Sequence, residues 1–390
     1  MNMTPARLSS VELIKRLVAF DTTSHKSNLD LIEFVRGYLA DYGIDSQLFE
    51  DETGQKANLY ATVGPDDRAG ICLSGHTDVV PVEGQKWSSD PFDPIERDDR
   101  IFGRGTCDMK SFIAIVLAKL PEFLDRGLDT PLHLSFSHDE EIGCAGVRSL
   151  IAGLEKMPIR PSGCIIGEPT DMKVIRGHKG KLSMECRVRG LSCHSSLVEH
   201  GVNAVEKAAA VIHFMGQMAE RLRTEGPLDD GYDPPYSSLH TGVIHGGTQL
   251  NIVPQDCTFE FEFRNLPNEN VDHLMAEIQD YAETKLLPAM HAVDPATGFA
   301  WEPLSGFPGL DTPEDAEITQ LALALAGAND TRKVAFGTEA GLFSNIGVPS
   351  VVCGPGSIEQ AHKPDEFITL EQVARCEQFL DRLMDRVCAA

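Results

Sequence analysis

The chain has 390 residues, enough for about two domains, and its 42% hydrophobic and 7% aromatic residues are typical of a globular protein. A formal net charge of −25 disfavours nucleic acid and anionic membranes as partners. The ten cysteines stand singly, without a C-x-x-C pair, which favours free thiols in a reducing cytoplasm. Met1–Ser10 has no apolar signal segment, and no apolar run approaches the roughly 18 residues of a membrane helix, so we expect a cytoplasmic protein without membrane contact.

The first chemically informative stretch follows two predicted helices, Val11–Phe20 and Leu29–Tyr42. It is Ile71–Pro81, I-C-L-S-G-H-T-D-V-V-P, which starts as a buried strand. His76 and Asp78 are two residues apart, so on extended backbone they point to the same side. An imidazole that binds a metal usually has its second nitrogen held by a carboxylate. The pattern predicts His76 as a metal ligand and Asp78 as its orienting partner; a chance H-x-D in a surface loop is the alternative.

A second motif, I-F-G-R-G-T-C-D-M-K, follows a loop predicted for Pro81–Arg100 and runs into an apolar helix at Ser111–Leu120. Asp108 stands just before this helix, where it is either a ligand or an ordinary N-cap. Cys107 is interpreted as a small buried thiol in preference to a nucleophile.

Acidic residues then end two further predicted strands. Leu132–Ser137 runs into His138-Asp139-Glu140-Glu141, and Gly163–Glu168 ends in a carboxylate. Clustered charges at a strand end are costly unless a cation lies there, although a solvated loop would also tolerate them. In α/β sheets the ligand crevice lies at the carboxyl ends of the strands, so we expect these groups to meet.

The pattern changes after Lys179 to strand, helix, strand, strand, helix, strand, which is an α+β order. We predict an inserted domain at residues 180–307. Residues 1–179 and 308–390 then form one discontinuous α/β domain, in which His362 follows a late strand and a glycine-rich turn. An exposed edge of the inserted sheet favours a homodimer.

Five motifs occur in the order H-T-D, G-R-G-T-C-D-M-K, D-E-E-I-G, G-E-P-T and H-K-P-D-E-F. With this series the chain resembles the dizinc family of peptidases and deacylases, which includes aminoacylases, carboxypeptidases and desuccinylases. C-I-I-G-E-P-T and G-P-G-S-I-E-Q-A-H-K-P-D-E are most similar to the acetylornithine deacetylase branch. The resemblance implies a metallopeptidase-like catalytic domain, with a central sheet flanked by helices, and an inserted ferredoxin-like lid and dimerisation domain.

The resemblance also implies two zinc ions per chain, with cobalt or manganese as substitutes. Asp108 would bridge both ions. His76 and Glu168 would complete one site, and Glu141 and His362 the other. A metal-bridging hydroxide would attack the amide, and Glu140 would act as general base.

Substrate contacts are implied in the same way. His194 of a neighbouring subunit would stabilise the oxyanion, and Asn251 and Arg264 would hold the substrate carboxylate, although a turn Asn and a strand Arg are the ordinary alternatives. Thr338 and Glu339 lie near the metal loop, and Glu339 would either bind the side-chain ammonium of ornithine or cap the next helix. The implied reaction converts N-acetyl-L-ornithine into L-ornithine and acetate.

Two residues depart from the family pattern: Ser111 and Cys193 stand where glycine is common. Cys193 weakens the substrate assignment more than the chemistry. The alternatives are another N-acyl amino acid deacylase, a desuccinylase or a metallocarboxypeptidase, and, from another class, a non-catalytic metal-binding relative. Glu140 disfavours the last, because it is not a ligand and has no evident purpose without hydrolysis. A cysteine hydrolase using Cys107 is a poorer alternative.

Overall fold

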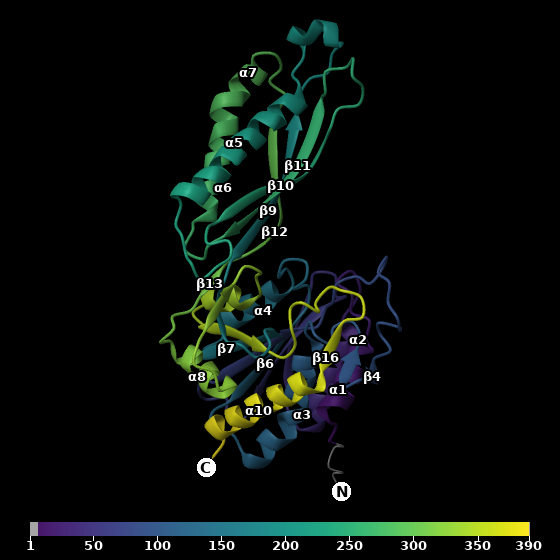
Figure 1. Ribbon diagram of the computed structural model, residues 1–390, viewed down its shortest axis with the longest axis vertical. Helices are drawn as coiled ribbons and strands as arrows, with labels where there is room; N and C mark the ends of the chain where they lie inside the picture. Colours follow the sequence, from purple (N-terminus) through teal and green to yellow (C-terminus); the bar gives the residue numbers. More distant parts are fainter. Residues whose placement is uncertain (1–6, 390) are drawn as a thin grey trace. The chain divides into compact units, whose positions relative to one another are not determined.

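A computed structural model describes residues 7–389, so the first six residues of the segment Met1–Ser10 lie outside it. The chain forms two compact units (Figure 1). The main unit comprises the residues up to Gly177, Leu310–Lys333 and those from Thr338 onward, and the insert comprises His178–Gly309 with Val334–Gly337. The predicted insert spanned residues 180–307. Among the described residues, no helix has the length and apolar character needed to cross a membrane.

The main unit is built on a mixed sheet with helices packed against it (Figure 1). Its strands are ordered β1-β2-β6-β3-β7-β15-β8-β13, with β14 paired to β8. Their bounds are β1 (Ser46–Glu50), β2 (Ala57–Val63), β3 (Ile71–His76), β6 (Leu132–Ser137), β7 (Gly163–Pro169), β8 (Ile175–His178), β13 (Leu310–Asp311), β14 (Arg332–Val334) and β15 (Ser350–Gly354). The helices are α1 (Ser10–Val18), α2 (Leu29–Asp41), α3 (Lys110–Arg126), α4 (Val147–Glu155), α8 (Glu317–Ala326), α9 (Ala340–Asn345) and α10 (Leu370–Val387).

Four neighbouring strands, β6, β3, β7 and β15, run parallel, so their carboxyl ends lie along one edge. Their residues are almost all buried, as expected for a parallel sheet covered on both faces. Helix α3 contacts α1, α10 and β3, and these elements contribute to one apolar core. The predicted ligands are therefore expected at the carboxyl edge of these strands, and the strands belong to the most buried part of the fold.

The insert is a four-stranded antiparallel sheet ordered β10-β11-β9-β12. Its elements are β9 (Gly180–Arg189), a 3₁₀ helix η1 (Ser195–His200), α5 (Ala204–Glu225), β10 (Ser238–Gly246), β11 (Asp256–Asn265), α6 (Val271–Tyr281), a π-helical turn η2 (Ala282–Leu286), α7 (Leu287–His291) and β12 (Gly298–Phe307). Buried residues of α5 and α6 pack with the sheet in a separate apolar core. The predicted ferredoxin-like order of strands and helices is confirmed.

The prediction of a loop over Pro81–Arg100 is wrong at its C-terminal end. A small sheet ordered β16-β5-β4 contains β4 (Ile95–Arg97), β5 (Arg100–Phe102) and β16 (Phe367–Thr369). Three-residue strands rich in charge carry no useful alternation. The middle strand also pairs with a segment from the far end of the chain, which local sequence does not reveal.

Gly167, one residue before the predicted ligand Glu168, has no room for a side chain. A Cβ at this position would lie 2.0 Å from the Phe112 ring of α3. We expect Gly167→Ala to lower the free energy of unfolding by about 1–3 kcal/mol through overpacking. Urea denaturation measures the loss.

Gly37 provides the control. It is exposed on α2, and a Cβ there meets nothing within 4 Å. Gly37→Ala should stabilise the protein by about 0.5–1 kcal/mol, because alanine favours helix over glycine. Equal effects of the two substitutions would contradict the packing argument.

Candidate metal centre

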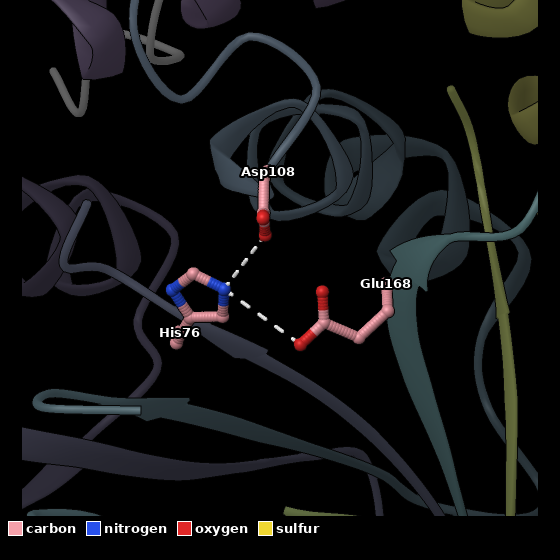
Figure 2. Close-up of side chains that lie close together, drawn as sticks. All are labelled: His76, Asp108 and Glu168. Carbon is pink, nitrogen blue, oxygen red and sulfur yellow. Dashed lines mark hydrogen bonds and ion pairs between the residues drawn. The ribbon is translucent and has the colours of Figure 1, made fainter. Parts of the chain in front are cut away.

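Three predicted ligands meet at the carboxyl edge of the parallel strands (Figure 2). His76 ends β3, Glu168 lies near the end of β7, and Asp108 comes from the loop before α3. The Nε2 atom of His76 lies 3.0 Å from Asp108 Oδ1 and 3.7 Å from Glu168 Oε1. All three side chains are buried, so one imidazole nitrogen faces two carboxylates away from bulk water.

A second group shares Asp108 with the first. His362 Nε2 lies 3.3 Å from Asp108 Oδ2 and 3.0 Å from Glu141 Oε2. The two oxygens of Asp108 therefore face different histidines. Helix α3 begins at Lys110 with Met109 at its N-cap, so the alternative that Asp108 caps the helix is wrong.

The donor atoms in each group fit a metal ion. They lie within 4.8 Å of one another and combine imidazole nitrogen with carboxylate oxygen, a set suited to zinc and similar divalent ions. Within residues 7–389, Glu141 Oε1 is buried and has no hydrogen-bond partner. This oxygen is available to a cation.

The pKa values of the side chains at the site also indicate that a cation can bind there. Burial, with the carboxylate of Asp108, raises the pKa of Glu168 well above its ordinary value and that of Glu141 to about 7. Burial opposes a charge on His76, but the carboxylates of Glu168 and Asp108 outweigh it and raise the pKa of His76 well above its ordinary value. The proton so favoured on the imidazole occupies the place where a metal would bind.

Asp78 holds several parts of the site in place. The carbonyl oxygen of Asp78 lies 2.9 Å from His76 Nδ1, while its carboxylate is 3.6 Å away. A carbonyl oxygen only accepts hydrogen bonds, so Nδ1 of His76 carries a hydrogen. Nε2 is then the nitrogen that can bind a metal ion. The carboxylate accepts from Ser24 Oγ at 2.8 Å and from the backbone N–H groups of Glu140 and Glu141 at 3.1 and 3.3 Å.

Glu140 lies beside the two donor groups without belonging to either. Burial, with the carboxylates of Glu141 and Asp108, raises its pKa to about 8. The Cys144 thiol lies 3.5 Å from Glu140 Oε1 and donates to it. A partly buried carboxylate next to a candidate metal centre, and outside both of its donor groups, is suited to proton transfer.

Glu339 is buried beneath the site and points into the sheet. Its two carboxylate oxygens accept hydrogen bonds from Ser74 Oγ of β3 at 2.5 Å and from Ser137 Oγ of β6 at 2.7 Å. The neighbouring Thr338 is also buried, and its hydroxyl accepts from the N–H of Ala340 at the start of α9. This geometry makes Glu339 a link between two strands and lends no support to the predicted contact with a substrate ammonium.

The other predicted substrate residues belong to the insert. His194 pairs with Ile252 in an isolated bridge, and the carbonyl oxygen of Asn251 accepts from the N–H of Ser195 at 3.0 Å. His194 and Asn251 therefore lie side by side. Arg264 is on β11, and its guanidinium binds the carboxylate of Glu262 at 3.0 and 3.4 Å.

The cysteines and Ser111 have structural partners. Cys107 is buried and its thiol donates to the carbonyl oxygen of Ser357 at 3.2 Å, while burial raises its pKa well above the ordinary value. The protonated thiol disfavours a cysteine hydrolase. Ser111 Oγ donates to the carbonyl oxygen of Thr106, and Cys193 Sγ donates to that of Leu197 at 3.2 Å.

Some residues that shape the site were missed by sequence reasoning. Ser24, Ser74 and Ser137 are ordinary serines in the sequence, and their positions carry no signal of their hydrogen bonds to buried carboxylates. Glu366 accepts the backbone N–H of Asp108 at 3.1 Å. It stands inside the motif H-K-P-D-E-F, so the motif could have identified it.

The chain is similar to known proteins over nearly its whole length. The model of Peptidase family M20/M25/M40 matches residues 72–386. Acetylornithine deacetylase of Myxococcus xanthus is 34% identical over 384 residues, 96% of either chain. The enzyme of that name from Pasteurella multocida (strain Pm70) is 32% identical over 389 residues, 97% of this chain and 98% of the relative.

Solved structures show the same fold. The M20 family metallo-carboxypeptidase Sso-CP2 from Sulfolobus solfataricus superposes with a TM-score of 0.75 at 16% identity, covering 97% of this chain and 98% of that one. Aminopeptidase PepT from Bacillus cereus gives 0.72 at 20% identity, covering 98% and 99%. The predicted catalytic fold with a helix-flanked central sheet is confirmed.

The position of Glu339 predicts a loss of stability when its carboxylate is removed. Glu339→Ala leaves the hydroxyl of Ser137 without its acceptor, so we expect the free energy of unfolding to fall by about 1–3 kcal/mol. Glu339→Gln keeps an acceptor oxygen and should lose less. Urea denaturation provides the measurement, with Glu155→Ala at an exposed position of α4 as control. A stability equal to that of the control would contradict the role as a link.

Proposed function

The chain belongs to Peptidase family M20/M25/M40 and is a metal-dependent deacylase, and we propose that it removes the acetyl group from N-acetyl-L-ornithine. The products are L-ornithine and acetate. The observation that carries the proposal is the pair of donor groups sharing Asp108, with Glu140 beside them. Similarity over nearly the whole chain to acetylornithine deacetylases supports the choice of substrate.

Two zinc ions, or cobalt or manganese in their place, are the proposed cofactor. His76, Asp108 and Glu168 would hold one ion, and Asp108, Glu141 and His362 the other. Bound there, the ions supply Lewis-acid polarisation of the amide and a lowered pKa for water.

Glu140 is the proposed general base. Its carboxylate accepts a proton from the attacking water and returns it to the leaving amine. The backbone N–H of Glu140 is fixed by Asp78, and its Oε1 accepts from the Cys144 thiol. These contacts support a base with a defined position, and burial keeps its proton affinity high.

His194 is proposed to stabilise the negative charge that develops on the amide oxygen. The N–H of Ser196 donates to its Nδ1 at 3.2 Å, so the ring hydrogen is on Nε2. An exposed Nε2–H is a suitable donor to an oxyanion. We propose that it acts on the site of a second subunit, in a homodimer joined through the insert.

The substrate carboxylate is proposed to bind Asn251 and Arg264. The Arg264 fork already holds a carboxylate, that of Glu262, which supports its capacity for bidentate binding. A substrate carboxylate would compete with Glu262 for it. Glu339 has no part in this proposal, since its oxygens are engaged within the main unit.

We also propose a cytoplasmic location. All ten cysteines are free thiols, and nine of them are buried. This usage favours a reducing compartment.

The substrate is tested with a panel. We expect N-acetyl-L-ornithine to be cleaved with a higher kcat/KM than N-acetyl-L-methionine, N-succinyl-diaminopimelate or a C-terminal dipeptide substrate, with zinc or cobalt added. Rates are measured by release of the free amine. Equal rates on neutral acetyl amino acids would identify a broad N-acyl amino acid deacylase, and a preference for the succinyl or dipeptide substrate would favour a desuccinylase or a carboxypeptidase.

The base is tested by Glu140→Gln, which keeps the size of the side chain and removes its basicity. We expect kcat to fall by about 10²–10⁴ with the metal content unchanged. Steady-state kinetics and elemental analysis measure the two quantities. Loss of a metal ion would make Glu140 a ligand and reverse its assignment with Glu141.

The role of His194 is tested by mixing subunits. His194→Ala alone should lower kcat by about 10²–10³, as for loss of an oxyanion donor. A purified heterodimer of His194→Ala and Glu140→Gln chains should recover activity, because one of its sites carries both intact groups. A verified heterodimer that stays inactive would refute action between subunits.

A further inference from the structure

His362 differs from the other predicted ligands in how it is held. Its side chain is 55% exposed. Its backbone has φ of 63°, a left-handed conformation that is energetically unfavourable for any residue with a Cβ atom. His76 and Glu168, by contrast, lie on buried strands. Packing does not fix His362, so its position depends on the hydrogen bonds of its loop.

One end of this loop is tied to the loop of Asp108 through Glu366. Oε1 of Glu366 accepts from the backbone N–H groups of Gly105, Cys107 and Asp108 at 3.0, 2.8 and 3.1 Å. Oε2 accepts from Arg104 Nη1 at 2.7 Å, and both side chains are buried. This contact fixes the loop four residues beyond His362, and Arg104 Nη1 also donates to the carbonyl oxygen of Lys363 at 3.3 Å. The carbonyl oxygen of His362 itself accepts from a different group.

That group is the amide of Gln85. Its Nε2 donates to the carbonyl oxygen of His362 at 3.0 Å. Its Oε1 accepts from Arg104 Nη2 at 2.6 Å and from Trp87 Nε1 at 3.1 Å. The guanidinium of Arg104 also lies 5.0 Å from the centre of the Trp87 ring. The two donors to Gln85 Oε1 therefore contact each other, and together they hold this oxygen in place.

We propose that Gln85 is a positioning residue for His362 and thereby sets the affinity of one metal site. The inference rests on the proposed two-metal function. The site affected is Asp108–Glu141–His362. The site His76–Asp108–Glu168 has no member bonded to Gln85 among the described contacts, and Asp108 is held through Glu366.

Gln85→Glu isolates this hydrogen bond. A carboxylate still accepts from Arg104 and Trp87, but it cannot donate to the carbonyl oxygen of His362 and places a second oxygen against it. Gln47→Glu is the matched control, with the same change of charge at an exposed position of β1. Thermal unfolding of both variants checks that neither alters the fold.

The experiment measures zinc and cobalt binding to metal-stripped protein by isothermal titration calorimetry. We expect two sites in the wild type and in Gln47→Glu. In Gln85→Glu one site should keep its affinity, and the other should weaken by about 10- to 100-fold, the usual range for losing a partner of a ligand.

Gln85→Met, which removes the whole amide, should show the same one-site loss. Two unchanged affinities in both Gln85 variants, or an equal fall at both sites, would overturn the role of Gln85 and leave the proposed function standing. A wild type that binds fewer than two ions would overturn the two-metal function and the positioning role together.

Discussion

Repulsion between carboxylates that share one buried space is the constraint on which the rest of the structure depends. Burial and mutual repulsion raise the pKa values of Glu168 and Glu141, so the chain alone does not favour their charged forms. Asp108 is the exception. Burial works against its charge, but hydrogen bonds from His362 and His76 outweigh it and lower its pKa. The Asp108 carboxylate, which lies between two imidazoles, is therefore the group of the site whose negative charge is favoured, and it can attract cations.

The sheet holds some residues of the candidate metal site in place, and hydrogen bonds within the loops hold the others. Parallel strands deliver His76 and Glu168 on backbone that is buried on both faces, and the Glu339 carboxylate joins β3 to β6 just beneath them. The loop residues depend instead on single polar groups, Asp78 for the segment of Glu140 and Glu366 for that of Asp108. The part of the site that lies on strands is therefore held by packing, and the part that lies on loops is held by hydrogen bonds.

Much of the fold could be predicted because its signals are local. The apolar runs of β3, β6 and β7 each end in a ligand or a ligand-bearing turn, and the alternation in β9 and β11 marks a sheet with one open face. Spacing alone left Asp108 ambiguous between ligand and helix cap. The ordered motifs of a known family, and not periodicity, predicted the full ligand set.

What could not be predicted depends on partners far apart in the chain. For Glu339 the predicted roles are a substrate contact or a helix cap, because nothing nearby in the sequence indicates that Ser74 and Ser137 donate hydrogen bonds to its oxygens. The pairing of β5 with β16 has the same origin. Hydrogen bonds across such separations exist only once the sheet has formed.

The positions at which the insert joins the main unit affect the conformational entropy that the chain loses when the site assembles. Strands β8 and β13, on either side of the insert, are neighbours in the sheet, and the N–H of Thr312 donates to the carbonyl oxygen of Arg176 at 2.9 Å. The insert has its own apolar core, so it closes this junction as a folded body instead of a long flexible loop. Loop-closure entropy grows with the number of flexible residues. His362 therefore returns to Asp108 at the conformational cost of a short connection, although the whole insert separates them in sequence.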